Sequence, residues 1–273
     1  MSKLSTSMHR VTLRDLAARK QQQQRISMVT CYDASFARLI DDTDIDIVLV
    51  GDSLGNVVLG YENTLPVTMD MMLHHTAAVA RGLKRALLVA DMPFGSYQES
   101  PEKALENAVK FLQQAGAHAV KLEGGSSILP QVKKLVDSGI PVMGHLGLTP
   151  QSVHQLGGYQ VQGRDHEAAE NLVREAHLLQ EAGVFALVLE MVPRDLARRV
   201  TQELRISTIG IGAGADTNGQ VLVLHDLLGF DREFQPKSLK TYASLGDIVT
   251  QALNEYSSEV KAGMFPSVEH SFK

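Results

Sequence analysis

Short apolar runs alternate with amphipathic segments along the chain, and this alternation is the strongest structural signal in the sequence. Residues 47–50 are four consecutive aliphatic residues, as in a parallel strand buried on both faces. Gly51 then permits a sharp turn, and Asp52 and Ser53 follow at the carboxyl end of the strand. In parallel α/β folds this end carries the chemistry, because helices cover the sheet and the loops at one rim are free to vary.

The same unit recurs to the end of the chain. Capping signals mark two helix starts, Thr12 with Asp15 and Ser100 before Pro101. The strand predicted at 220–224 is the weakest, because this segment could equally start a helix. Further strands are predicted at residues 26–31, 47–50, 86–90, 119–122, 140–143, 185–189 and 208–211, and helices at 34–40, 69–81, 100–116, 129–136, 167–182, 194–204 and 242–260.

Strands alternating with helices favour a parallel α/β fold, and we expect a closed (βα)8 barrel, the TIM barrel, rather than an open sheet. The length of 273 residues, 44% of them hydrophobic, is close to the usual size of one such barrel. We therefore expect a single domain over residues 1–273, with residues 1–10 as a flexible N-terminal extension.

Composition and charge narrow the classes of molecule that the protein is expected to bind. A net charge of −5 and a pI of about 6.1 give no basic surface for nucleic acid. No apolar run approaches the roughly 18 residues of a membrane span, and residues 1–10 contain no hydrophobic segment of signal-peptide length. Cys31 is the single cysteine and lies in an apolar run, so we expect a core position for it and a reducing compartment for the protein. Together with the charge and the missing apolar runs, this predicts a cytoplasmic protein with small-molecule substrates.

Residues 51–55 read GDSLG, which matches both the G-x-S-x-G nucleophile elbow and the GDSL signature of a hydrolase family. Either reading makes Ser53 a nucleophile, whereas an ordinary βα turn with a helix cap looks the same. The chain has no Asn-Asp dipeptide and no D-x-x-H, and His225 and His270 are the late histidines an elbow hydrolase would need. We therefore predict that Ser53 contacts a ligand and is not a nucleophile.

Polar side chains recur where the predicted strands end. A single carboxylate at a strand end is usually a helix cap or an ion-pair partner, but several on one rim raise one another's pKa and call for a cation or a reacting group. Carboxylates without further histidines or cysteines at ligand spacing favour Mg²⁺ over Zn²⁺. The residues at these positions are Asp52, Asp91, Lys121, Glu123, His145 and Glu190.

Two glycine-rich stretches have competing readings. The segment 144–164 has the length and the glycines of a closing lid, although an irregular surface loop is the alternative. Residues 209–214, IGIGAG, suggest a phosphate loop, but the G-x-G-x-x-G spacing and a nearby lysine are missing. A tight turn at the rim is the preferred interpretation of this stretch.

The chain resembles the ketopantoate hydroxymethyltransferase family along almost its whole length. The resemblance is more specific than any single motif, because several distinct motifs occur in the family's order. They are VLVGDSLG at 48–55, TLPVT at 64–68, ADMPFGSY at 90–97, VKLEGG at 120–125, GHLGLTPQS at 144–152, GGYQVQGR at 157–164, LVLE at 187–190, IGIGAG at 209–214 and EHSF at 269–272.

The resemblance implies a (βα)8 barrel that transfers a hydroxymethyl group from 5,10-methylenetetrahydrofolate to 3-methyl-2-oxobutanoate, giving 2-dehydropantoate in pantothenate biosynthesis. It also implies bound Mg²⁺ and a homodecamer. Folate contacts are poorly marked in the motifs. By matching motifs, the metal residues are Asp52, Asp91 and Glu123, the substrate contacts are Asp52, Ser53, Asp91, Lys121 and His145, and the proton acceptor is Glu190.

Independent chemistry supports this assignment. A 2-oxoacid offers Mg²⁺ a carboxylate oxygen and a keto oxygen, and chelation makes the C3 proton more acidic. Glu190 would remove that proton, with the enolate held by the metal and Lys121. Two further alternatives keep the barrel: a lyase of the phosphoenolpyruvate/pyruvate type, and a non-catalytic oxoacid-binding scaffold.

Overall fold

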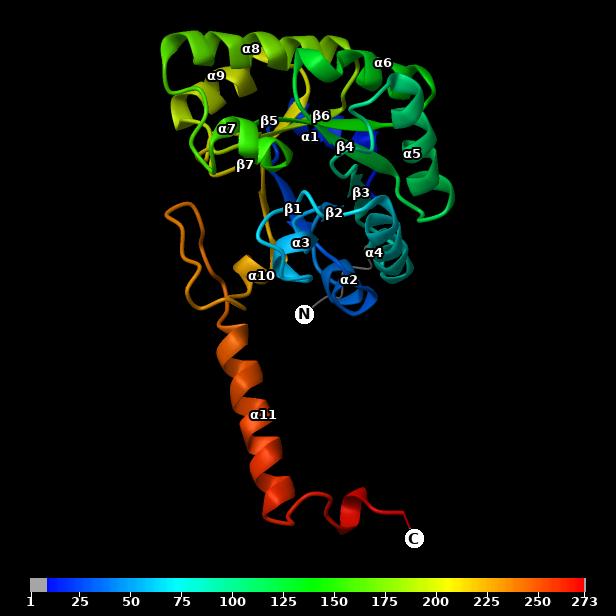
Figure 1. Ribbon diagram of the computed structural model, residues 1–273, viewed down its shortest axis with the longest axis vertical. Helices are drawn as coiled ribbons and strands as arrows, with labels where there is room; N and C mark the ends of the chain where they lie inside the picture. The colour runs from blue at the N-terminus through cyan, green and yellow to red at the C-terminus, as the bar shows by residue number, and fades with distance from the viewer. Residues whose placement is uncertain (1–8, 273) are drawn as a thin grey trace. The chain divides into compact units, whose positions relative to one another are not determined.

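Eight parallel strands close into a barrel in the structure, a computed structural model that describes residues 9–272 (Figure 1). The strands pair in chain order, and β8 pairs with β1 to close the sheet. Of the predicted N-terminal extension, residues 1–8 lie outside the described residues. The strands are β1 Ile26–Thr30, β2 Ile47–Val50, β3 Leu87–Asp91, β4 Ala119–Glu123, β5 Val142–Gly147, β6 Ala186–Glu190, β7 Ser207–Ile211 and β8 Gly219–Leu222. The predicted (βα)8 barrel is confirmed.

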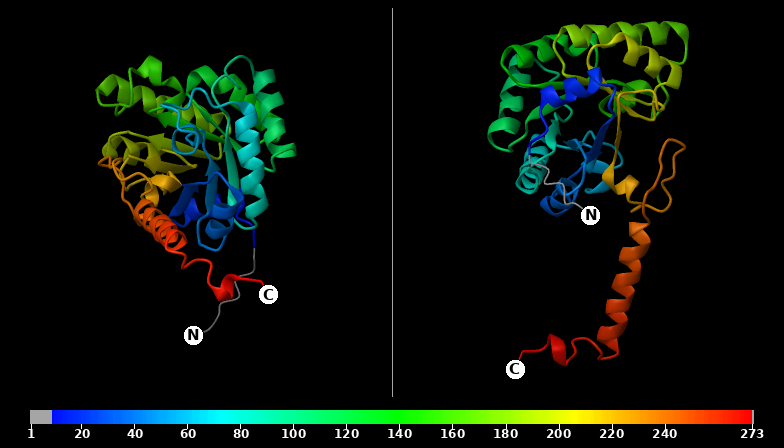
Figure 2. Two further views of the ribbon diagram at one scale, coloured as in Figure 1. Left: turned by 60° about the horizontal axis from the view of Figure 1, so that its bottom comes forward. Right: turned by 180° about the vertical axis from the view of Figure 1, so that it is seen from behind.

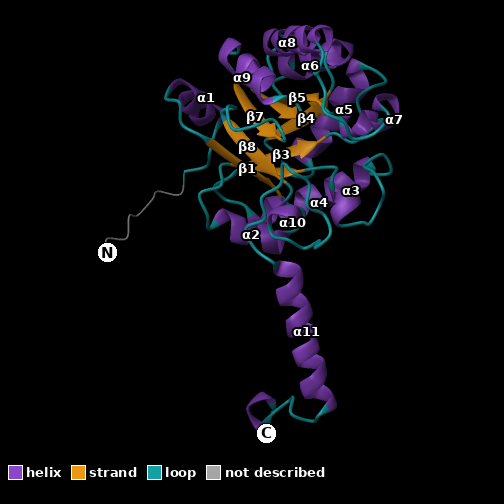
Figure 3. Ribbon diagram, turned by 90° about the vertical axis from the view of Figure 1, so that its left-hand side faces the viewer, coloured by secondary structure: helices purple, strands orange, loops and turns teal. Residues whose placement is uncertain are grey.

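Helices surround the barrel. Figure 3 shows them in purple around the orange strands, and the two views of Figure 2 show the same arrangement from other sides. Thr12 and Asp15 form the predicted capping box, and Ser100 Oγ accepts from the Lys103 N–H at the start of α5. The helices that precede or follow the strands are α1 Leu13–Gln21, α2 Ala34–Asp41, α3 Leu54–Val57, α4 Met69–Gly82, α5 Pro101–Gln113, α6 Leu129–Asp137, α7 Val153–Leu156, α8 His166–Glu181 and α9 Arg194–Glu203.

The core of the barrel follows the period of two along the strands. Alternate strand residues form one buried apolar cluster, to which Leu16 of α1 is added. Cys31 is fully buried, as expected of a core residue. The strand members of the cluster are Ile26, Met28, Ile47, Leu49, Leu87, Val89, Ala119, Met143, Ala186, Val188, Ile209 and Val221. These positions fix which strand residues face the barrel interior.

Several predicted boundaries are wrong at the strand ends. β5 continues to Gly147, four residues beyond its predicted end, while β3 and β4 extend over Asp91 and Glu123. Each of these two carboxylates accepts a hydrogen bond from a backbone N–H group and lies near the Lys121 ammonium group, which satisfies it in the buried sheet. The expected loop at 144–164 also contains the 3₁₀ helix η2 (Pro150–Ser152) and α7. After β7, positive φ angles at Gly212 (62°) and Gly214 (79°) form the predicted tight turn.

The chain divides into two compact units, one running as far as Leu222 and the other beginning at Val223. The second unit contains α10 (Leu224–Leu227), α11 (Leu245–Lys261) and the short 3₁₀ helix η3 (Val268–His270). α11 begins three residues later than the predicted 242 and has no buried residue among those described. None of the described helices combines the length and the apolar character that crossing a bilayer requires.

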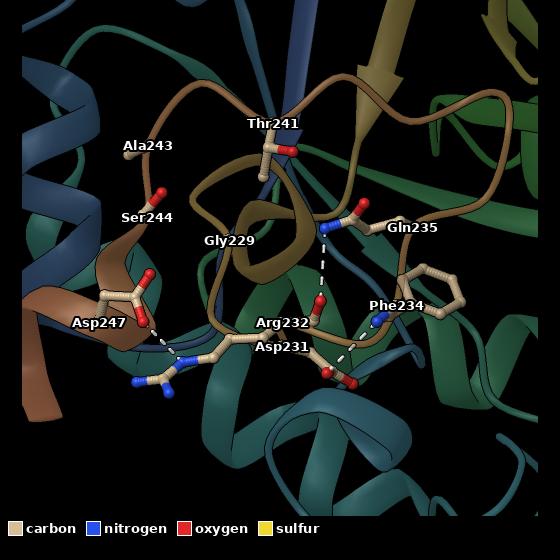
Figure 4. A pocket seen from close by; sticks show the side chains of 9 residues that line it. All are labelled: Gly229, Asp231, Arg232, Phe234, Gln235, Thr241, Ala243, Ser244 and Asp247. Atoms are coloured by element: carbon tan, nitrogen blue, oxygen red, sulfur yellow. Dashed lines mark hydrogen bonds and ion pairs between the residues drawn. The ribbon is translucent and has the colours of Figure 1, made fainter.

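The second unit has a shallow pocket of about 120 Å³ (Figure 4). One wall is an ion pair between Arg232 Nε and Asp247 Oδ1 at 2.8 Å, and both side chains are largely exposed. The lining residues are Gly229, Asp231, Arg232, Phe234, Gln235, Thr241, Ala243, Ser244 and Asp247. None of the residues singled out in the sequence belongs to it.

Barrel closure leaves no space for a side chain at Gly219, which pairs with Ile26 of β1 and Ile209 of β7. A Cβ there would lie 2.4 Å from Ile26 O and 2.7 Å from Ile209 Cδ1. We predict that Gly219→Ala lowers the free energy of unfolding by about 1–3 kcal/mol, and Gly219→Val by more, because β8 must move away from both neighbours. Urea unfolding followed by circular dichroism measures this. Equal midpoints for the parent and both variants would contradict it.

Candidate active site

The interior rows of the barrel change from apolar to polar at the carboxyl ends of the strands. Val89 of β3 belongs to the interior core, and Asp91 follows it two residues later, on the same face of the strand. The same step of two leads from the interior core to a polar side chain on each of the next three strands. Those side chains are Lys121 and then Glu123 on β4, His145 on β5 and Glu190 on β6.

Strand register brings these side chains next to one another. Asp91 is paired with Lys121, and Glu123 with His145. Glu190 is paired with Gly147, one step of two beyond His145. The structure therefore collects the predicted rim residues of four neighbouring strands in one place.

Asp52 joins this group from the turn after β2. Its backbone N–H donates to Asp91 Oδ2 at 3.1 Å, while Lys121 Nζ lies 2.6 Å from Asp91 Oδ1. The three residues are 3–4% exposed. Asp91 is thus engaged at both carboxylate oxygens, and an ammonium group is buried among acids.

His145 links the lysine to the two glutamates. Its Nδ1 lies 3.1 Å from Lys121 Nζ and 3.5 Å from Glu123 Oε1, and its Nε2 lies 3.5 Å from Glu190 Oε2. Burial, together with the charge of Lys121, holds the pKa of His145 well below its usual range, so the ring is neutral. Because the ammonium group donates, we assign Nδ1 as the acceptor and the ring proton to Nε2, on the side of Glu190.

Burial dominates the acid–base properties of the carboxylates. It raises the pKa of Asp52 to about 7, helped by the charge of Asp91 and opposed by Lys121. The pKa values of Asp91 and Glu123 are also raised by burial against the opposing charge of Lys121. Burial raises the pKa of Glu190, whose side chain is 20% exposed, to about 8. Such shifts are typical of groups that bind a cation or transfer protons.

Lys121 stays charged in this environment. Burial alone would lower its pKa, but the carboxylates of Asp91, Glu123 and Asp52 outweigh that effect and raise it. A permanent positive charge is therefore held where an anionic substrate or a developing negative charge would be stabilised.

Ser53 lies at the same rim, directly before α3. Its hydroxyl oxygen is 2.9 Å from Tyr32 Oη. A phenol is a poor base near neutral pH, so this pairing does not activate a serine nucleophile. The contact with Tyr32 supports neither hydrolase reading, and the ligand contact of Ser53 stays a prediction.

Two buried residues of the site were missed in the sequence, Gln151 and Tyr97. Gln151 Nε2 donates to Asp52 Oδ2 at 2.9 Å, and its backbone N–H donates to Glu123 Oε2 at 3.1 Å. Tyr97 Oη donates to Gln151 Oε1 at 2.8 Å. Both residues lie in motifs that carry the family resemblance, ADMPFGSY and GLTPQS, but neither directly follows an apolar run.

The donor set fits a hard divalent cation through two carboxylates. Asp52 and Asp91 are buried together, and burial and mutual repulsion raise the pKa of Asp52, which a cation would relieve. Glu123 already accepts from Gln151 at Oε2. Within residues 9–272, no three His, Cys, Asp or Glu side chains form a ready-made metal cage. Mg²⁺ does not need one, since it commonly uses one or two carboxylates with water and substrate oxygens.

A parallel barrel with acids, a charged lysine and a neutral histidine at its carboxyl rim defines a barrel enzyme suited to moving protons beside an oxygen-rich ligand. The ketopantoate hydroxymethyltransferase family model matches residues 10–268. The chain therefore belongs to the ketopantoate hydroxymethyltransferase family and is a hydroxymethyltransferase enzyme, which confirms the resemblance seen in the sequence.

Curated relatives match along nearly their whole length. The 3-methyl-2-oxobutanoate hydroxymethyltransferase of Syntrophomonas wolfei subsp. wolfei is 55% identical over 265 residues, covering 97% of this chain and 96% of the relative. The protein of the same name from Moorella thermoacetica is 57% identical over 264 residues, covering 97% and 98%.

Solved structures of other enzymes share the barrel. Phosphonopyruvate hydrolase superimposes with a TM-score of 0.62 at 10% identity, covering 96% of this chain and 91% of that chain. 2,3-Dimethylmalate lyase, a member of the PEP mutase/isocitrate lyase superfamily, gives 0.58 at 15% identity with the same coverages. At these identities the likeness shows a common fold alone.

The raised pKa of Glu190 makes stability depend on pH. Below about pH 4.5 the residue is protonated in both folded and unfolded states; between there and about pH 8 only the folded state keeps the proton. The folded state then binds more protons, so this contribution to stability falls as the pH rises and is lost above about 8. We predict that, in EDTA, Glu190→Gln becomes steadily more stable relative to the parent from pH 5 to pH 8, as urea unfolding measures.

Glu181→Gln, at the exposed end of α8, is the matched control. Its stability difference from the parent should not grow over this pH range. A Glu190→Gln difference as flat as that of the control would contradict the predicted proton linkage.

Proposed function

We propose that this protein transfers a hydroxymethyl group from 5,10-methylenetetrahydrofolate to 3-methyl-2-oxobutanoate, giving 2-dehydropantoate in pantothenate biosynthesis, with Mg²⁺ as its cation. The observation that carries the proposal is the convergence, at one buried rim, of the residues that the family's motifs mark as functional. The curated relatives bear the name of this oxoacid substrate and of the hydroxymethyl transfer.

The chemistry of the oxoacid matches the charges of the site. A 2-oxoacid carries a carboxylate and a keto oxygen, and the hydrogen on C3 is acidic because it is adjacent to the carbonyl. Deprotonation at C3 moves negative charge onto the keto oxygen. Lys121, buried and permanently charged, would stabilise that oxygen, an interaction commonly worth about 3–4 kcal/mol for each donor.

Glu190 is the proposed general base. It takes the C3 proton, and the electrons of the broken C–H bond form the C2–C3 double bond of the enolate. C3 then forms a carbon–carbon bond to the one-carbon unit as both C–N bonds of the donor methylene group break. Water supplies the new hydroxyl group, and tetrahydrofolate leaves with one proton from that water and one equivalent to the proton taken by Glu190. A pKa of about 8 suits this task, because a base works best when its pKa lies near the operating pH. The Nε2 atom of His145, to which the ring proton is assigned, lies 3.5 Å from Glu190 Oε2.

Asp52 and Asp91 would hold the cation, with Glu123 as a further acidic group nearby. Bound Mg²⁺ would supply Lewis-acid polarisation of the oxoacid carbonyl. Ser53, at the same rim, would contact the oxoacid. Of the segment predicted as a lid, residues 144–147 belong to β5, so the lid prediction is confined to residues 148–164, where Gln151 is bound to the acidic side chains.

Assembly and location also stay predictions. α11 carries exposed apolar side chains, with Leu253 62% and Tyr256 56% exposed, and such a face is commonly covered in an oligomer. This supports assembly into an oligomer. The homodecamer implied by the family resemblance stays a prediction, which light scattering of the purified protein would test. The cytoplasmic location rests on the composition described above.

We predict that Asp52→Asn and Asp91→Asn each weaken Mg²⁺ binding at least tenfold, because each removes a full charge from a hard-ion site while keeping the side-chain shape. Isothermal titration calorimetry with Mg²⁺ alone measures this. Asp137→Asn, on the exposed end of α6, is the control and should bind Mg²⁺ as the parent does. Unchanged affinity in both site variants would refute the metal assignment.

The function itself is tested with 3-methyl-2-oxobutanoate in D₂O. The parent protein with Mg²⁺ should exchange the C3 proton without folate, and should form 2-dehydropantoate when 5,10-methylenetetrahydrofolate is added; proton NMR follows both. We predict that Glu190→Gln binds Mg²⁺ and the oxoacid nearly normally yet loses the exchange by at least about 100-fold, because the base is gone.

Glu181→Gln serves again as the control and should exchange at the parental rate. Exchange by Glu190→Gln as fast as by the parent would place the base elsewhere, with His145 the first candidate. A parent that exchanges no proton and forms no product would exclude the proposed reaction.

A further inference from the structure

Gln151 links the acidic side chains of the site to the segment that follows β5. It lies in η2 and is 5% exposed, and its side-chain and backbone groups point toward residues from four other parts of the chain. A buried amide is costly unless its hydrogen bonds are made, so its partners show what it is there to hold. The inference that follows rests on the proposed function.

Every hydrogen-bonding position of the Gln151 amide is used. Nε2 donates to Asp52 Oδ2 at 2.9 Å and to the Met92 carbonyl at 3.0 Å. Oε1 accepts from Tyr97 Oη at 2.8 Å and from Gln98 Nε2 at 3.3 Å. The opposite orientation of the amide would set its oxygen against a carboxylate and a carbonyl, so a single orientation is selected.

The partners of Gln151 are themselves fixed. Tyr97 is 1% exposed, and its hydroxyl oxygen accepts from the Glu123 N–H at 3.1 Å, so the phenol is anchored to β4. The backbone N–H of Gln151 donates to Glu123 Oε2 at 3.1 Å. One residue therefore contacts the carboxylates of Asp52, in the turn after β2, and of Glu123, at the end of β4.

Asp52 needs such a partner because Asp91 lies beside it. Two buried carboxylates repel each other and favour rotation of their side chains away from one another. A neutral donor on Asp52 Oδ2 opposes that rotation without the competing positive charge that an arginine or lysine would add against a cation. The carboxylate is then held ready before any ligand arrives.

We propose that Gln151 is a positioning residue for the hydroxymethyl transfer, which fixes Asp52 through its amide and Glu123 through its backbone N–H and so couples the segment after β5 to the cation site. A purely structural amide would affect folding alone. Gln151 acts on a group assigned to the cation, so its loss must also be visible in cation binding.

The test is Gln151→Met, which removes both side-chain donors while keeping the length of the side chain and its backbone N–H. We expect the Kd for Mg²⁺, measured by calorimetry with the metal alone, to rise about 10- to 100-fold. The increase in Tm produced by Mg²⁺ should shrink accordingly, and kcat for the oxoacid should fall more than KM rises.

Gln180→Met is the matched control. Gln180 Oε1 accepts from the Arg205 and Ile206 N–H groups at 2.6 and 3.3 Å, just before β7 and thus at the amino-terminal end of the strands. This variant should lower Tm yet bind Mg²⁺ with parental affinity. If Gln151→Met does the same, Gln151 is only structural and the inference is overturned.

A second variant keeps the test decisive if Gln151→Met does not fold. Tyr97→Phe removes the hydroxyl that holds Gln151 Oε1, and should raise the Kd for Mg²⁺ several-fold; unchanged affinity overturns the inference. If the parent binds Mg²⁺ and forms product while Gln151→Met is unaffected, only the role of Gln151 is refuted. A parent that does neither refutes the proposed function as well.

Discussion

The charge of Lys121 is the interaction on which the rest of the site depends. Its ammonium group lies 2.6 Å from Asp91 and 3.6 Å from Glu123, and every one of these groups is buried. The charge of Lys121 opposes the effect of burial on these acids but does not cancel it, since the pKa values of Asp52, Asp91 and Glu123 stay raised. A cation bound beside these acids would favour their charged forms further, while Lys121 lets the acids share one small volume.

The barrel keeps these charged groups together. The strands that carry them have interior faces packed with apolar side chains, and the charged groups lie at or close to the strand ends: Asp91, Lys121, Glu123 and Glu190. Paired strands in a closed sheet cannot move apart without losing backbone hydrogen bonds and core contacts. The repulsion among the acids is therefore opposed by the whole core, and the side chains stay preorganised for a ligand.

Much of this site is readable from the sequence, because a buried strand has a strict period of two. A polar residue that directly follows the apolar run of a strand is expected at the carboxyl-terminal rim of the barrel. This rule identifies Asp91, Glu123, His145 and Glu190. Gln151 escapes the rule because it lies in the 3₁₀ helix η2 rather than at a strand end, and its contact with Asp52 joins residues 99 positions apart. The end of β5 was missed for a related reason, since its later residues continue the sheet after the continuous apolar run has stopped.

The segment GDSLG shows why local motifs decide so little without their surroundings. Its serine becomes a nucleophile only beside a base, and here the Ser53 hydroxyl lies 2.9 Å from a phenol. The barrel fold does not determine the reaction either, since phosphonopyruvate hydrolase and 2,3-dimethylmalate lyase share the fold at 10% and 15% identity. What distinguishes one such enzyme from another is the set of side chains that ends each strand. In this chain that set combines a glutamate of raised pKa on β6 with a charged lysine on β4, a pair suited to the proposed formation and stabilisation of an enolate.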